Sequence, residues 1–162
     1  MGRLKAVVLM GALASLGAGA ATAQGGARAQ SLSRAQQLVN GTAAAHPELA
    51  GLELAVVTGG VCKTVAATDP KDIGERCDAD ELGPMRTGEP DVEAPSASDP
   101  VYDITQALHD SAGRLIGAVG MDLKPAAGQP PAAVLAKARA ILREMEAAIP
   151  SKATLFQPVP SR

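Results

Sequence analysis

The sequence has 162 residues, a formal net charge of −2 at pH 7 and 46% hydrophobic residues, but one tyrosine, one phenylalanine and no tryptophan. This length suits one domain with one hydrophobic core. A mildly acidic chain without a basic patch does not match the charge of nucleic acid or of anionic membranes, so we expect neither as a partner.

Residues 1–23 have the pattern of a cleaved secretory signal peptide. Arg3 and Lys5 precede an apolar run over 6–20, and the small residues 21–23 suit cleavage before Gln24. An uncleaved anchor is the alternative, but the apolar run is shorter than the roughly 20 residues that span a bilayer. We therefore expect a periplasmic or secreted mature chain that does not insert into membranes and, without Arg3 and Lys5, has a net charge of about −4.

Residues 24–30 are rich in glycine and alanine and are expected to be a flexible N-terminus. Beyond them, Ser31 or Ser33 can cap a helix that ends before Pro47. Two strands follow, over 52–58 and 61–68, and the intervening Gly59-Gly60 pair predicts a hairpin because two-residue turns need positive φ angles.

Cys62 and Cys77 are the only cysteines. In an oxidising compartment they are expected to form a disulfide, and closing a loop of about 15 residues stabilises a domain by about 3 kcal/mol. The sequence has no Cys-x-x-Cys redox pair, no haem attachment motif and no histidine pair near the cysteines that would favour zinc. We expect no metal and no cofactor.

The segment 69–100 is punctuated by proline and glycine and predicts an irregular crossover, with one short helix over 78–82 and an exposed acidic loop over 89–100. Strands over 101–109 and 114–123 then form a second hairpin. With a flush turn, Ile104 would face Val119 and Asp103 would face Gly120.

A C-terminal amphipathic helix is predicted over 130–149, and 150–162 is expected to be a tail. The apolar stripe of the helix, from Val134 to Ile149, can cover the domain's own sheet or form a homodimer. The order of helix, hairpin, crossover, hairpin and helix predicts an α+β fold with an antiparallel sheet.

Three segments carry a family resemblance: "TVAATDPKDIGERCDADEL" (64–82), "YDITQAL" (102–108) and "GRLIGAVGMDL" (113–123). They resemble the extracytoplasmic Cache sensor domains, which are PAS-like ligand-binding modules of bacterial receptors. The likeness covers residues 31–124. It implies a five- or six-stranded antiparallel sheet, a long N-terminal helix behind it, and a small-molecule pocket between the sheet and the crossover.

Alternation along the second hairpin predicts which face holds the pocket. Bulky apolar residues share one face of the strands, whereas Asp103, Thr105 and Asp122 share the other face with glycine and alanine. Small side chains beside a few polar groups suit a ligand pocket. In amino-acid-binding relatives an acid in the position resembling Asp122 meets the ligand amine; the alternative is a carboxylate at the rim of the sheet, paired with a basic side chain or backbone amides.

Lys63, Arg86 and Tyr102 complete the predicted ligand-binding residues, because they can hold a small organic anion. Arg86 lies in the crossover, which forms the lid of the pocket in the resembling family. The sequence has no Gly-x-Ser-x-Gly elbow, no His-Glu-x-x-His motif and no phosphate loop, so we expect no catalysis.

The relatives are tethered between membrane helices, whereas this chain has a predicted cleavable signal and no output module. We therefore expect a freestanding periplasmic protein that binds a small polar metabolite, an organic acid or amino acid, and presents it to a membrane receptor or transporter component. The alternative is a non-catalytic protein-interaction module that keeps the fold without a pocket.

Overall fold

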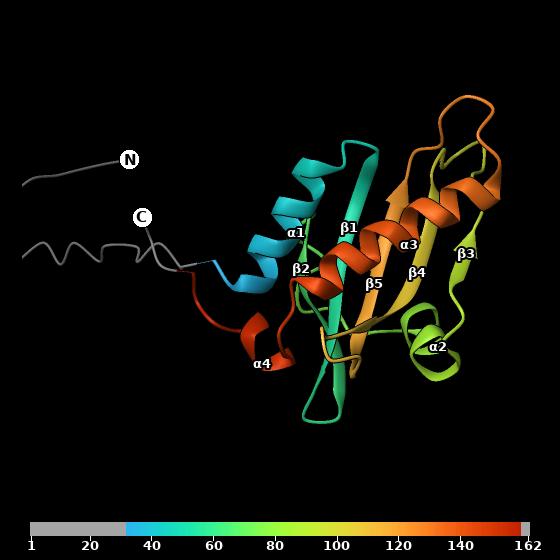
Figure 1. Cartoon of the computed structure of the whole chain (residues 1–162). Coiled ribbons are helices and arrows are strands. Elements are labelled where there is room, and N and C mark those ends of the chain that lie inside the picture. Colours follow the sequence, from blue (N-terminus) through green and yellow to red (C-terminus); the bar gives the residue numbers. More distant parts are fainter. Residues whose placement is uncertain (1–31, 160–162) are drawn as a thin grey trace, which may run out of the picture.

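The computed structural model describes residues 32–159 and shows an α+β fold built on one five-stranded antiparallel sheet (Figure 1). The strand order is β2-β1-β5-β4-β3. The elements are α1 (Arg34–Ala45), β1 (Leu49–Thr58), β2 (Val61–Ala67), α2 (Ala79–Thr87), β3 (Asp91–Glu93), β4 (Tyr102–His109), β5 (Leu115–Leu123), α3 (Pro131–Ala147) and α4 (Lys152–Leu155). The predicted α+β class and antiparallel sheet are confirmed, whereas the predicted signal peptide and flexible N-terminus lie outside the described residues.

Helices α1 and α3 cover one face of the sheet (Figure 1). Ser33 caps α1 by accepting a hydrogen bond from the backbone N–H of Gln36 at 3.1 Å. The core lies between these helices and the sheet and contains apolar residues from both layers, including Val39, Leu54, Ile104, Leu108, Val119 and Met121. Within residues 32–159 no helix is long and apolar enough to cross a membrane.

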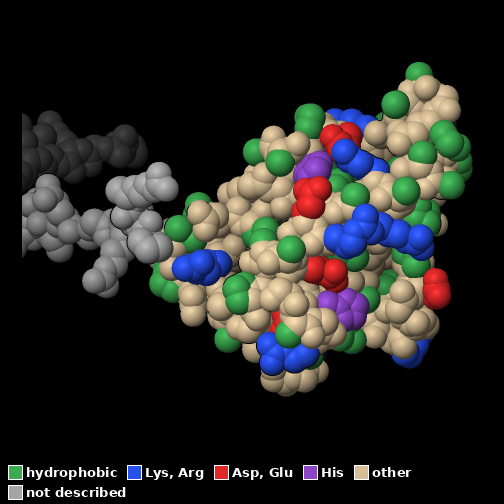
Figure 2. All heavy atoms as spheres, viewed as in Figure 1, with side chains coloured by type: hydrophobic (Ala, Val, Ile, Leu, Met, Phe, Trp, Pro, Cys, Tyr) green, Lys and Arg blue, Asp and Glu red, His purple; other side chains and the backbone are tan. Residues whose placement is uncertain are grey.

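The apolar stripe of α3 belongs to this core. Val134, Ala138, Ile141 and Met145 are each at most 2% exposed. Figure 2 shows acidic and basic side chains interspersed over the outer surface on the side of α1 and α3. On this side, His46 pairs with Glu144 at 2.9 Å. A homodimer through α3 stays a prediction, and it would have to use the outer side of the helix, since the stripe is already buried.

The pairing of β4 with β5 differs from the flush hairpin that the sequence predicts. Asp103 pairs with Asp122 and Ile104 with Met121, a displacement of two residues from the predicted partners. A three-residue turn, closed by the Asp110 N–H donating to the Arg114 carbonyl at 2.9 Å, displaces the register by one residue. A bulge between Leu108 and His109 displaces it by a second residue. Beyond the bulge, a shift of two keeps the side chains on their predicted faces. At the bulge the prediction is wrong, because Leu115, expected on the core face, is 46% exposed and Ile116 is buried in the core instead.

The crossover contains more regular structure than the sequence predicts. Helix α2 begins after Asp78, which forms a capping box with Glu81, and it continues through Pro84 to Thr87 instead of ending at residue 82. Three residues of the expected acidic loop form edge strand β3, which pairs with β4. The prolines and glycines therefore predicted correctly that the segment is not one regular element, but they did not predict the full length of α2 or the short strand β3.

The segment expected to be a tail packs against the domain as far as Val159. Its short helix α4 buries Leu155, which is 3% exposed. The backbone N–H of Arg34 donates to the Gln157 carbonyl at 2.9 Å, and that of Val159 donates to the Leu32 carbonyl at 2.8 Å. Residues 150–159 therefore join the N-terminal part of the fold to the end of α3.

Candidate functional site

A pocket of about 490 Å³ lies on the sheet face opposite α1 and α3. Strands β1, β4 and β5 form its floor, and residues 68–72, which follow β2, form one wall. Its acidic lining residues are Glu53, Asp69, Asp72, Asp103 and Asp122, and no lysine or arginine lines it. The volume falls within the range of small-molecule sites, about 300 to 1,000 Å³.

Three carboxylates come together on this floor because their strands are neighbours. Asp122 of β5 pairs with Asp103 of β4 on one side and with Gly51 of β1 on the other. Glu53 of β1 and Thr105 of β4 both pair with Gly120. The positions nearest Asp122 on this face therefore carry two carboxylates, one hydroxyl and two glycines. The floor is therefore acidic and open.

The two glycines are needed for this arrangement. A Cβ atom on Gly51 would collide with the carboxylate of Asp122, and a Cβ on Gly120 would lie 3.1 Å from Cγ of Glu53. The first contact would force the Asp122 side chain to move, and the second would force a small shift of the Glu53 side chain. Glycine at these positions lets the neighbouring carboxylates lie across the sheet.

The environment raises the pKa of each floor carboxylate. Burial, followed by the nearby charges of Glu81 and Asp72, raises the pKa of Glu53 to about 7. Burial and the facing Asp122 raise the pKa of Asp103 to about 6. Burial also raises the pKa of Asp122 above its usual range. Burial and the neighbouring carboxylates thus disfavour the ionised form of all three floor side chains.

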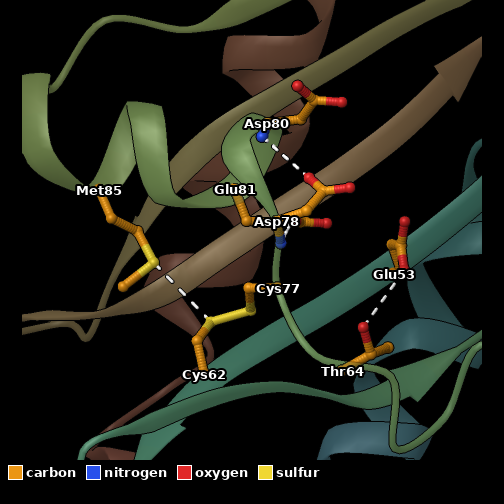
Figure 3. Close-up of a disulfide and its surroundings, with 8 residues drawn as sticks. All are labelled: Glu53, Cys62, Thr64, Cys77, Asp78, Asp80, Glu81 and Met85. Carbon is orange, nitrogen blue, oxygen red and sulfur yellow. Dashed lines mark hydrogen bonds between the residues drawn. A yellow bond between two sulfur atoms is a disulfide. The ribbon is translucent and has the colours of Figure 1, made fainter.

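Figure 3 shows Glu53 with its hydrogen-bond partner Thr64 and the acidic start of α2 nearby. The Thr64 hydroxyl donates to Oε2 of Glu53 at 3.4 Å. Within residues 32–159 no group of three or more histidine, cysteine, aspartate or glutamate side chains is arranged to hold a metal ion.

The structure brings together only some of the ligand-binding residues predicted from the sequence. Asp103 and Asp122 line the pocket. Thr105 lies on the same face, two residues along β4, and is buried beside Asp103 and Asp80 in a space too small for a ligand. The ligand roles of these residues stay predictions.

The other predicted residues lie elsewhere. Tyr102 packs against the core on the helix side of the sheet, and Arg86 is exposed on α2, outside the pocket lining. Lys63 lies in a separate groove with Arg76. No cation that was assigned to an organic anion therefore reaches the acidic pocket.

Glu53 is the main pocket residue that the sequence analysis did not select. It lies in the apolar strand between Leu52 and Leu54, as Asp122 lies between Met121 and Leu123. Asp72 was also missed, because a carboxylate in an irregular segment carries no periodic signal. The pattern of an acid inside an apolar strand would have found Glu53.

The disulfide that the sequence predicts joins Cys62 of β2 to Cys77, with their Cα atoms 5.4 Å apart (Figure 3). It links the sheet to the chain just before α2, and Sγ of Cys62 lies 4.0 Å from Sδ of Met85 on that helix. The disulfide therefore holds the crossover beside the sheet just before α2.

These layers, the strand order and the pocket face define an α+β fold of the PAS-like type. No family model matches the chain, the Cache family included, and no curated protein matches it. Solved structures do match. The Agobacterium tumefaciens repressor BlcR has a TM-score of 0.50 at 14% identity, over 73% of this chain and 68% of that chain.

A type II free methionine-R-sulfoxide reductase from Thermoplasma acidophilum also has a TM-score of 0.50, at 19% identity over 68% of this chain and 86% of that chain. The inducer-binding domain of the Acinetobacter transcription factor PobR, in complex with 3-hydroxybenzoic acid, has a lower TM-score of 0.43 at 11% identity, over 72% of this chain and 95% of that chain. At these identities the likeness shows the fold alone, since a repressor and a reductase share it.

Proposed function

We propose that this chain is an extracytoplasmic, non-catalytic sensor-type protein that binds a small molecule carrying a cationic amine. The observation that carries the proposal is the pocket floor, where the partly buried Glu53 and Asp122 and the more exposed Asp103 meet with no lysine or arginine in the lining. An ammonium group bound there would supply the counter-charge that the carboxylates lack.

The charge of the pocket selects between the two ligand classes expected from the sequence. An organic acid would add negative charge beside carboxylates whose pKa values are already raised, and like charges at short distance are unfavourable. An amino acid or a simple amine can direct its ammonium group to Asp122 and Asp103 instead. The proposal therefore keeps the amino acid, adds amines and leaves out simple organic acids.

The proposed location outside the cytoplasm is supported by the disulfide, because such bonds persist in oxidising compartments. A membrane receptor or transporter component is the partner we propose for the liganded protein. The interaction-module alternative has less support, since the stripe that it would use, from Val134 to Ile149, is buried in the core.

A thermal-shift screen of the purified protein against amines, amino acids and dicarboxylates tests the proposal. A ligand present at about 100 times its dissociation constant stabilises the folded state by about 2.7 kcal/mol. We expect stabilisation by amine-bearing compounds and none by dicarboxylates.

The Asp122→Asn variant should lose most of this stabilisation, because it removes a charge from the floor. Glu89→Gln is the matched control, since Glu89 is an exposed carboxylate outside the pocket lining. Stabilisation by dicarboxylates alone, or an equal response of Asp122→Asn and the unmodified protein to amines, would contradict the proposal.

A further inference from the structure

A second concave surface lies on the other face of the sheet, beside the β1–β2 hairpin. This groove has a volume of about 480 Å³ and is lined by Val56 and Thr58 of β1, by Val61, Lys63 and Val65 of β2, and by Arg76 and Phe156. We call it the hairpin groove. It shares no lining residue with the acidic pocket.

The register of the hairpin explains why the floor of this groove is apolar. Val56 pairs with Lys63, and Thr58 pairs with Val61, so these residues share the helix side of the sheet. Helix α1 meets β2 at the far end of the strand, where the Gln36 side chain donates to the Ala67 carbonyl at 2.8 Å. The part of the hairpin nearer its turn therefore keeps an open apolar surface.

Phe156 forms the wall of the groove next to α4. Its side chain is 47% exposed, although it is one of only two aromatic residues in the sequence. Lys152 holds α4 against the hairpin, because its Nζ donates to the Val57 carbonyl at 2.9 Å. An exposed aromatic ring next to Val61 and Val65 gives an apolar ligand a surface to cover.

Two cations lie at the edge of the groove and are positioned by the backbone. Lys63 and Arg76 are partners in an antiparallel bridge, which is flanked by the Thr64 N–H donating to the Glu75 carbonyl at 3.0 Å. The Cys62–Cys77 disulfide joins the residues directly before Lys63 and after Arg76. The geometry therefore fixes both backbones side by side.

Neither cation has a counter-charge of its own in the described part of the chain. Among residues 32–159, Lys63 and Arg76 take part in no side-chain hydrogen bond or ion pair, and no aspartate or glutamate lines the groove. Arginine and lysine together match a carboxylate, and a guanidinium can bind it with two parallel hydrogen bonds.

We propose that the hairpin groove is a second binding site, for a small hydrophobic carboxylate. The apolar part of the ligand lies on Val61, Val65 and Phe156, and its carboxylate lies between Lys63 and Arg76. This site is distinct from the proposed amine site, because it is on the opposite face of the sheet and has the opposite charge.

Isothermal titration of the purified protein with octanoate tests this site, with acetate and octylammonium as ligand controls. We expect saturable binding of octanoate and none of acetate, which lacks the apolar part. Amide shifts in NMR spectra should change at Val61, Val65 and Phe156. Octylammonium should not compete with octanoate, since its charge repels the two cations.

Lys63→Gln and Arg76→Gln should each weaken octanoate binding about fivefold, the effect of losing one exposed charged contact. Phe156→Ala should also weaken it, through lost apolar contact. Arg139→Gln is the matched control, because Arg139 is an exposed cation on α3 outside the groove. Asp122→Asn should leave octanoate binding unchanged, which separates this site from the amine pocket.

The absence of saturable octanoate binding in the folded protein would overturn the proposal, as would equal affinities for the unmodified protein and both charge variants. Sedimentation tests the other occupant, a second copy of this chain. If Phe156→Ala abolishes self-association and octanoate neither binds nor competes with it, the groove is a contact between copies and the carboxylate site is refuted.

Discussion

Replacing Glu53 with glutamine should stabilise the protein at alkaline pH and leave its stability almost unchanged at acidic pH. Glu53 is half-buried on the pocket floor near Glu81 and Asp72, and its pKa is raised from 4.5 to about 7. Folding therefore favours the protonated side chain. This contribution is complete below about pH 4.5 and is lost as the pH rises through about 7. Glutamine mimics the protonated form at every pH and keeps an oxygen that can accept from Thr64.

The size of the effect follows from the pKa shift and the burial. A rise of about 2.5 units corresponds to an upper limit of about 3 kcal/mol, at about 1.4 kcal/mol for each unit. The side chain is only half-buried, and solvent screening reduces the interaction, so we expect about 1 to 2 kcal/mol. At pH 8 the Glu53→Gln variant should therefore unfold at a higher urea concentration than the unmodified protein.

Urea unfolding at pH 5 and pH 8, followed by circular dichroism, measures this difference. Glu89→Gln provides the control for removing a carboxylate from an exposed position. The control should show no comparable dependence on pH. If Glu53→Gln destabilised the protein equally at both pH values, the charge on Glu53 would not be the unfavourable element of the floor, and the basis for a cationic ligand would be lost with it.

Four further predictions concern the pocket and the fold. Amine binding should strengthen from pH 5 to pH 8 in titration calorimetry, because floor carboxylates with pKa values of about 6 and about 7 ionise in this range. Gly117→Ala should destabilise the protein by about 2 to 3 kcal/mol in urea unfolding, since its Cβ would collide with β1, whereas Gly41→Ala on open helix surface should stabilise it by up to about 1 kcal/mol. Ile141→Ala should lower the free energy of unfolding by about 2 to 4 kcal/mol, because Ile141 is fully buried. Reducing the Cys62–Cys77 disulfide should lower it by about 3 kcal/mol, and free-thiol titration before reduction should find none.

The sequence predicted the faces of the sheet better than the partners across it. Period-two alternation placed Asp103 and Asp122 on the open face and Ile104 with the core, as the structure has them. The partners depend on the turn, and a three-residue turn followed by a bulge at Leu108 each moved the register by one residue. Because the two displacements add to an even number, the predicted faces are correct from Gly117 onward. The faces of Leu115 and Ile116, which lie between the turn and the bulge, are reversed.

The pocket was harder to predict, because its charge comes from strands that are distant in the sequence. Asp122 and Asp103 belong to one hairpin, but Glu53 joins them only because β1 lies next to β5 in the sheet. The sequence predicted Lys63, Arg86 and Tyr102 as anion-binding residues. It does not reveal that their side chains lie outside this pocket. Of the organic acid and the amino acid expected from the sequence, the three-dimensional arrangement therefore supports our proposal of a ligand with an amine.

The segment that follows β2 joins the two proposed sites, and its irregularity is what allows it to do so. Asp72 faces the acidic pocket, whereas Arg76, four residues later, lines the hairpin groove on the other face. Gly74 lies between them with a φ of 98°, a conformation that other residues rarely adopt, and its N–H donates to the Thr64 carbonyl at 2.9 Å. In a regular strand, Asp72 and Arg76 would lie on the same face, because they are four residues apart. This turn, which the disulfide at Cys77 holds in place, instead directs the carboxylate and the guanidinium to opposite faces of the sheet. Gly74, one of the residues that predicted an irregular segment here, therefore allows the short crossover to contribute to both proposed sites, which are opposite in charge.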